Sequence, residues 1–260
     1  MKLGRQPRKF NPRVPHLSAL LASSTRVLPP PLPAVDWTSV FAPGFNFGVM
    51  LNDQLGDCTC AGIYHARQIW DANANPPCDP EPDANVLETY REACGYKDGD
   101  PTTDNGGIEQ DVLAFWLNHG VPVSTPQVAG ATVDKLLAFF EIDVRSLDDV
   151  RRTIDWCGGC YIGMLIPSYI MGAIPTVWSV QTGDDHILGG HCVYLTGYDP
   201  VGPHFISWGV KYQMTWEYFA RYVDEAYGLV DRLWATKTGK TPVGLSLEEL
   251  QAQMVALKTT

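Results

Sequence analysis

One stretch constrains the fold of this chain more than any other, because no residue from Trp156 to Gly183 carries a charged side chain. So long an uncharged run must be shielded from water, either in a membrane or in a protein core. Pro167, Pro175 and several glycines interrupt it, and a bilayer does not tolerate a broken backbone without partners for its polar groups. We therefore expect a buried strand and a loop here, and no membrane span.

The spacing of apolar residues changes along the chain from helical to strand-like. We expect helices from Gly56-Asp57 to about Ala74, with Asp57 as the cap, and over residues 84–93, 108–118, 146–156 and 215–227. Alternating patterns predict strands at 161–166, 191–198 and 205–208. Helices followed by strands are typical of an α+β protein, here with a helical lobe, a strand-rich lobe and a cleft between them.

Basic residues are concentrated at the start of the chain. Residues 1–35 hold six basic side chains and no acidic one, whereas the remainder holds 13 basic and 29 acidic groups. So acidic a body argues against nucleic-acid binding. We divide the chain into an extended, proline-rich arm (1–35), a two-lobed domain (36–236), and a linker with a C-terminal helix (237–260). The arm has little apolar surface to offset an ordering entropy of ~1–2 kcal/mol per residue. We therefore expect it to become ordered only on a neighbouring protein subunit.

The seven cysteines are an odd number, and no signal peptide is recognisable. Reduced thiols and a cytoplasmic location are the expectation. The Cys157-Gly158-Gly159-Cys160 string has the spacing of a redox motif, but it follows a helix instead of starting one. It also lacks a second ligand pair for zinc. We expect neither a metal nor a cofactor.

The residue with the clearest chemical potential is Cys58, at the predicted start of a helix. The N–H groups and the dipole of a helix N-terminus stabilise a thiolate and so favour a nucleophile. Such a nucleophile needs a base, and His191, 133 residues further on at the start of an apolar strand, is the candidate. His186, in a polar loop, is an alternative base. From this pairing we expect a Cys58 thiolate that persists well below the usual thiol pKa of ~8.5.

Four segments resemble, in the same order, motifs of the papain-like cysteine peptidase superfamily. They are NDQLGDCT at 52–59, DNGG at 104–107, GGHCVYLTGYD at 189–199, and Ser207-Trp208-Gly209. The chain thus resembles a divergent bacterial or phage-type branch with an LGDCT nucleophile motif. The resemblance implies a papain-like fold and a substrate cleft lined by Asn105, Gly106, Gly107 and Trp208.

The resemblance also implies catalytic roles for the matched residues. The family places an amide six residues before its nucleophile to help bind the oxyanion. That spacing fits Cys58 with Asn52, and equally the alternative nucleophile Cys60 with Gln54; the motif favours Cys58. The family's histidine-orienting Asn or Asp is replaced by Ile206 in this chain. The adjacent Ser207 is the candidate for a weaker hydrogen bond to the imidazole.

Two functions follow from this resemblance. The first is a cysteine peptidase, a hydrolase that cleaves a peptide or isopeptide bond by Cys-His nucleophilic catalysis. The second is a weakly active or inactive papain-fold protein that serves as a structural or interaction module, for example associated with a phage virion. The loss of the amide or carboxylate at Ile206 and the extended arm favour the second; the four ordered motifs favour the first.

Overall fold

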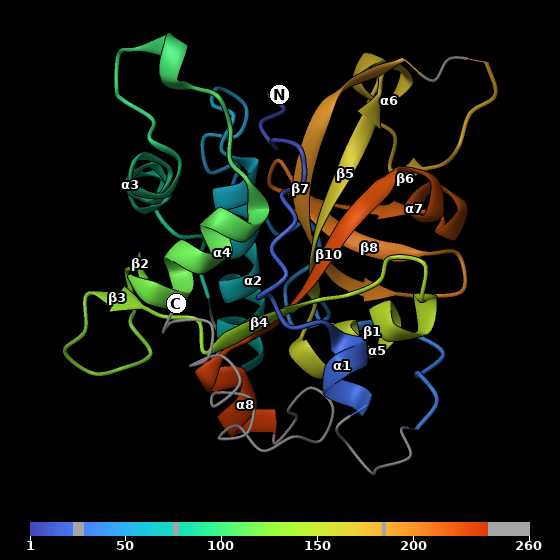
Figure 1. Ribbon diagram of the computed structural model, residues 1–260, viewed down its shortest axis with the longest axis horizontal. Coiled ribbons are helices and arrows are strands. Elements are labelled where there is room, and N and C mark those ends of the chain that lie inside the picture. The colour runs from blue at the N-terminus through green and yellow to red at the C-terminus, as the bar shows by residue number, and fades with distance from the viewer. Residues whose placement is uncertain (23–28, 75–77, 184–185, 239–260) are drawn as a thin grey trace.

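The computed structural model describes residues 1–22, 29–74, 78–183 and 186–238, which form two lobes side by side (Figure 1). The helical lobe comprises α2 (Cys58–Ala74), α3 (Asp83–Cys94), the 3-10 turn η1 (Pro101–Thr103), α4 (Glu109–Asn118), β2 (Val121–Pro122) and β3 (Val133–Asp134). Helix α2 is buried along almost its whole length. It contacts β7 of the strand lobe and so joins the two lobes.

The strand lobe is built on one mixed sheet. Its strands run in the order β4 (Ala138–Glu141), β10 (Val223–Val230), β5 (Cys160–Pro167), β7 (Ile187–Tyr198), β8 (Pro203–Ser207), β9 (Val210–Met214) and β6 (Val177–Trp178), and β1 (Val35–Asp36) pairs with β7. The helices α5 (Leu147–Cys157), α6 (Ser168–Gly172) and α7 (Trp216–Tyr222) pack on this sheet, whereas α8 (Arg232–Thr238) contacts α2. The α+β architecture expected from the sequence is confirmed.

The uncharged stretch forms β5, α6 and β6, and seven of the eight residues of β5 are buried. This is the buried strand and loop that the sequence predicts. Strand β5 pairs with β10 on one side and β7 on the other, so its backbone polar groups find partners without water. No helix among the described residues is long and apolar enough to cross a membrane.

The structure confirms only the first part of the helix expected over residues 215–227. The pattern at 215–227 predicts a single helix, but α7 ends at Tyr222 and β10 begins at Val223. The acidic pair Asp224-Glu225 imitates the polar face of a surface helix. The structure instead buries Glu225 within the sheet. There it forms an ion pair with Arg5, from the start of the chain.

The first 22 residues lie on the chain's own body. They run between the two lobes and end in α1 (Leu17–Ala22) (Figure 1). The expectation that this segment orders only on a neighbouring subunit is therefore wrong. Its ordering entropy is offset by backbone hydrogen bonds to both lobes and by burial of Val14, Leu17 and Leu20. The expected C-terminal linker and helix lie outside the described residues from position 239 onward.

Candidate active site

Cys58 is the first residue of α2 and is fully buried. The carbonyl of Asp57 accepts the first hydrogen bonds of the helix, from the backbone N–H groups of Cys60 and Ala61 at 2.8 and 3.0 Å. Burial raises the pKa of the Cys58 thiol, and the backbone of Cys192 and that of Gly4 are close enough to the thiol to lower this pKa by a smaller amount. The candidate nucleophile therefore lies between the residue that follows His191 and the N-terminal arm.

His191 lies on β7 and is held from two directions. Its Nε2 is 2.8 Å from Ser207 Oγ, and its ring stacks on Trp208 with centroids 4.6 Å apart and planes at 18°. Its other nitrogen, Nδ1, is buried and has no hydrogen-bond partner among the described residues. An imidazole anchored through one nitrogen keeps the other available for proton transfer.

A tight hairpin positions both partners of His191. Strand β8 ends at Ser207 and β9 begins at Val210, which leaves a two-residue turn of Trp208 and Gly209. Both turn residues have positive φ, 48° and 78°, as the favoured two-residue hairpin turns require. For a tryptophan this conformation costs about 1–3 kcal/mol. Stacking on His191 and packing near Trp178 offset that cost.

The alternative nucleophile has different surroundings. The Cys60 thiol is also buried, but its neighbours are Cys94 of α3 and Thr59, on the side of the helical lobe. Gln54, the amide that would pair with it, is exposed. Cys58, with its contact to the backbone of Cys192, is thus the better placed of the two cysteines.

Asn52 is buried near the start of α2 but is engaged in its own loop. Its Nδ2 donates to the carbonyl of Leu55 at 3.2 Å, and its carbonyl accepts the backbone N–H of Lys2. His186, the alternative base, is exposed on a loop, where its carbonyl accepts the N–H of Ser168.

The arm passes through the site as an added strand. Arg5 bridges Gly107 in parallel and Gly190 in antiparallel fashion. The carbonyl of Gly4 accepts the N–H of Gly107 at 2.8 Å, the N–H of Gln6 donates to Gly107 at 2.9 Å, and the N–H of Arg5 donates to Gly190 at 3.1 Å. The cleft therefore grips an extended peptide by its backbone from both lobes, the mode known as strand addition.

The loop that the sequence assigns to substrate binding contacts this peptide. The amide of Gln6 donates to the carbonyls of Asn105 and Gly106, while Gly107 forms the backbone pairs. Gly106 has a φ of 77°, and a Cβ added there would overlap the carbonyl oxygen of Gly4. Sequence reasoning missed Gly190 and the arm itself. The glycine pair 189–190 beside the candidate histidine was a signal for close backbone approach.

Burial governs the electrostatics of the site. Desolvation raises the pKa of Cys58 to about 12, and desolvation, with a smaller effect of the nearby His65, lowers the pKa of His191 to about 3. Both groups are therefore neutral at pH 7. The expectation of a Cys58 thiolate at low pH is wrong for this closed arrangement, because burial removes the water that a thiolate needs.

Two other features from the sequence lie apart from this site. Cys157 and Cys160 are buried free thiols where α5 gives way to β5. No group of three or more His, Cys, Asp or Glu residues suited to a metal ion occurs in the described part of the chain.

The two lobes, the helix-borne cysteine and the strand-borne histidine define a papain-like fold. No protein-family model matches the chain, and no curated protein matches it in sequence. Among solved structures it is similar to xylellain, a cysteine protease from Xylella fastidiosa. The TM-score is 0.64 at 16% identity, over 88% of this chain and 95% of xylellain.

Two further solved structures have the same fold. Similarity to proCathepsin B S9 from Trypanosoma congolense has a TM-score of 0.57 at 10% identity, over 88% of this chain and 86% of the other. For digestive procathepsin L 3 of Tenebrio molitor the TM-score is 0.54 at 14% identity, over 81% and 73% of the two chains.

Proposed function

We propose that this protein is a papain-like cysteine peptidase whose own N-terminal arm keeps it latent. The observation that carries the proposal is the anchoring of His191. Ser207 holds its Nε2 and Trp208 covers its ring, so that the unpartnered Nδ1 is available to a thiol. Cys58, at the start of α2, is the cysteine whose thiol reaches the backbone of the residue next to His191.

The proposed chemistry uses these two groups in turn. His191 takes the proton of Cys58 as the sulfur attacks a peptide carbonyl carbon, and the resulting imidazolium gives that proton to the leaving amine as the C–N bond breaks. Water, activated by the same imidazole, then hydrolyses the thioester and restores the thiol. The backbone N–H of Cys58 stabilises the oxyanion, with the side chain of Asn52 as second donor once it turns from Leu55.

The arm supports latency for two reasons. Gly4 lies against the thiol, so that a substrate carbonyl cannot occupy the same position. The arm also keeps the cysteine and histidine dry and neutral, whereas attack requires a thiolate. Opening of the cleft would return water to both groups and bring their pKa values back toward each other.

Gly4→Val in the full chain tests this proposal. A Cβ on Gly4 would overlap the carbonyl oxygen of Gly56, so the variant should displace the arm and digest denatured casein, while the wild type digests it slowly or not at all. Gly4→Val combined with Cys58→Ala should be inactive. If the folded Gly4→Val chain exposes Cys58 to a thiol reagent but cleaves nothing, the chain is a papain fold without catalysis. That is the second function expected from the sequence; the structural neighbours give no support to its association with a phage.

A further inference from the structure

The side chain of Arg5 fills an acidic pocket beside the cleft. It is only 1% exposed and forms ion pairs with three carboxylates: Nη2 lies 2.6 Å from Asp224 and 2.5 Å from Glu225, and Nε lies 3.3 Å from Glu109. Glu109 is the first residue of α4 in the helical lobe, whereas Asp224 and Glu225 follow Val223, the first residue of β10, in the strand lobe. The guanidinium therefore joins the two walls of the cleft.

The carboxylates of the pocket are held by residues of the body. Tyr227 donates to Glu225 Oε2 at 2.7 Å and fixes that carboxylate, and both Glu109 and Glu225 are buried. Burial raises the pKa values of both, whereas the charge of Arg5 lowers them. Among the described residues, Arg5 is the ion-pair partner of both Glu109 and Glu225, and neither glutamate pairs with another of them. Leaving buried carboxylates without a cation is strongly unfavourable, so the empty pocket attracts a positive side chain.

The floor of the pocket is shaped for the same group. Gly163 of β5 lies under the guanidinium, and a Cβ added there would overlap Arg5 Nε and meet Glu109 Oε1 at 2.5 Å. Any side chain on this strand position would fill the pocket. The absence of one leaves space for a side chain as long as arginine.

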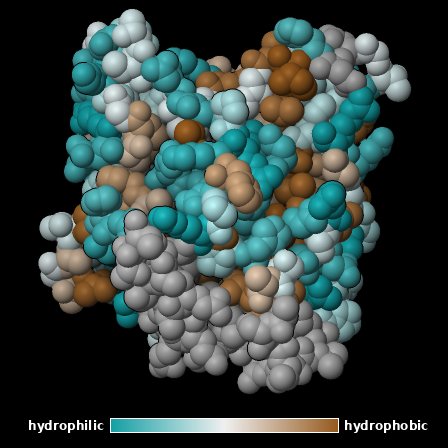
Figure 2. All heavy atoms as spheres, viewed as in Figure 1, coloured by the Kyte–Doolittle hydropathy of each residue, from teal (hydrophilic) through white to brown (hydrophobic). Residues whose placement is uncertain are grey.

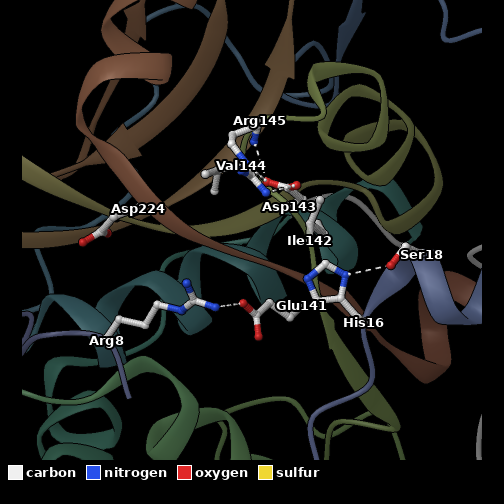
Figure 3. A pocket seen from close by; sticks show the side chains of 9 residues that line it. All are labelled: Arg8, His16, Ser18, Glu141, Ile142, Asp143, Val144, Arg145 and Asp224. Atoms are coloured by element: carbon white, nitrogen blue, oxygen red, sulfur yellow. Dashed lines mark hydrogen bonds and ion pairs between the residues drawn. The ribbon is translucent and has the colours of Figure 1, made fainter. Parts of the chain in front are cut away.

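Backbone and side chain are recognised separately. Gly107 and Gly190 bind the backbone around Arg5, and such bonds form with any extended peptide, whereas a pocket for one side chain supplies specificity. The pocket is also open at one end. Asp224, with a side chain 40% exposed, lines a cavity of about 430 Å³ together with Arg8 and Glu141, which form an ion pair there (Figure 3).

With the arm in place, hydrophilic residues dominate the middle of the face along which the arm runs, while apolar residues gather at the upper edge of the strand lobe (Figure 2).

We propose that Glu109, Asp224 and Glu225 form the specificity pocket of the cleft, and that it selects peptides with arginine at the position that Arg5 occupies. Lysine ranks second, because the pocket engages both Nε and Nη2 of the planar guanidinium and an ammonium offers a single point charge. This assignment of substrate class rests on the proposed peptidase function.

Binding in trans tests the pocket without catalysis. The full chain carries Gly4→Val, Arg5→Ala and Cys58→Ala, and the probe is a fluorescein-labelled peptide with the sequence of residues 2–8, measured by fluorescence anisotropy. We expect the peptide to bind at least about tenfold more tightly than its versions with norleucine or glutamate at the position of Arg5, as loss of a charge-assisted pair implies. The arginine at the position of Arg8 is kept in all three peptides. Equal or tighter binding of the norleucine peptide, or no binding of any peptide to the folded chain, would overturn the proposal.

Variants of the pocket provide the matched comparison. Glu225→Gln should reduce the preference for arginine over norleucine several-fold. Asp111→Asn, which removes an exposed carboxylate that pairs with Lys9 outside the pocket, should leave it unchanged. A larger loss of the preference for arginine in Asp111→Asn than in Glu225→Gln would assign that preference to general surface charge.

Two further readouts separate this proposal from the peptidase function. With Cys58 intact, turnover without a preference for arginine would refute the specificity pocket but support the peptidase function. Binding of the arginine peptide without turnover would support the pocket but refute the peptidase function. If the triple variant does not fold, iodoacetamide labelling of Cys58 in single variants replaces the binding assay. The rate should rise from wild type to Arg5→Lys to Arg5→Met, and equal rates for the two variants would overturn the proposal.

Discussion

His191 Nε2 lies 2.8 Å from Ser207 Oγ, and this serine is the group that fixes the imidazole in place of an amide or carboxylate. Because Ser207 is neutral, it orients the ring but stabilises an imidazolium less than a carboxylate does. Removal of the hydroxyl would let the ring turn about Trp208 and would leave Nε2 buried without a partner.

Ser207→Ala in the Gly4→Val background should therefore lower kcat/KM by about 10- to 100-fold, the effect of one hydrogen bond to a group that becomes charged. The measurement is peptide turnover across pH, which also records any shift in the pKa that governs activity. Ser18→Ala is the control, because Ser18 lies on α1 and makes an exposed hydrogen bond to His16 (Figure 3). An unchanged kcat/KM in the Ser207 variant would remove this serine from the site.

Thiol labelling should distinguish the two cysteines at the start of α2. In the wild type, iodoacetamide should modify Cys58 slowly, since burial raises its pKa to about 12 and the arm covers it. Gly4→Val should accelerate labelling of Cys58 at least about tenfold by populating the open cleft. Mass spectrometry identifies the modified residue, and Cys58→Ala should abolish the fast phase.

Two controls accompany this labelling experiment. Cys60→Ala should leave the fast phase unchanged, because the Cys60 thiol lies beside Cys94. Gly172→Val should leave wild-type kinetics unchanged, because a Cβ at Gly172 meets no atom within 4 Å. Fast labelling of Cys60 in the open chain would transfer the nucleophile's role to that residue.

The sequence predicted the elements whose signals are local. The helix at 58–74 has a start signal and an apolar face, and the strand at 191–198 alternates, so both are readable from neighbouring residues. Strand β10 was not readable, because Glu225 is made compatible with a buried strand by Arg5, 220 residues away. A pattern of neighbouring residues around Glu225 cannot indicate a partner so distant in the sequence.

The arm illustrates the same limit. Its apolar content predicted disorder without a partner, but its stability comes from backbone pairing of Gly4, Arg5 and Gln6 with two lobes. Every residue except proline carries the same backbone donor and acceptor, so composition does not reveal where these groups pair. The motifs at 104–107 and 189–199 were found by their resemblance to a family, whereas the close approach of the arm to Gly106, Gly107 and Gly190 was seen only in the structure.

Anchoring of the arm by α1 should contribute measurably to stability. Leu20 is 1% exposed, and Leu20→Ala should lower the free energy of unfolding by about 2–5 kcal/mol, as expected for a truncated core leucine. Urea unfolding followed by tryptophan fluorescence measures it. Phe10→Ala, at a side chain 74% exposed, should change stability little. A Leu20 variant as stable as the wild type would show that the arm does not pack on the body in solution.

The pH dependence of stability should reflect two buried neutral histidines. Burial lowers the pKa of His65 to about 4 and that of His191 to about 3, whereas in the unfolded chain a histidine has a pKa of ~6.5. Between about pH 6.5 and 4 the unfolded state therefore binds protons that the folded state does not. Stability is fully present above this window and falls as the pH is lowered, by up to ~1.4 kcal/mol per pH unit for each histidine.

His65→Gln isolates one of these contributions. The glutamine amide can donate to the carbonyl of Gly48, as His65 Nε2 does at 3.1 Å, but it does not titrate. The free energy of unfolding, measured at pH 6.5, 5.5 and 4.5, should therefore fall less steeply with decreasing pH in the variant. The difference in slope should be up to ~1.4 kcal/mol per pH unit, the contribution of one titrating histidine. The raised pKa values of Glu109 and Glu225 act in the opposite direction, but they are common to both chains and cancel in the difference. His119→Gln, at an exposed ring, is the control. Parallel pH profiles for His65→Gln and the wild type would mean that His65 is protonated, or reaches water, in the folded chain.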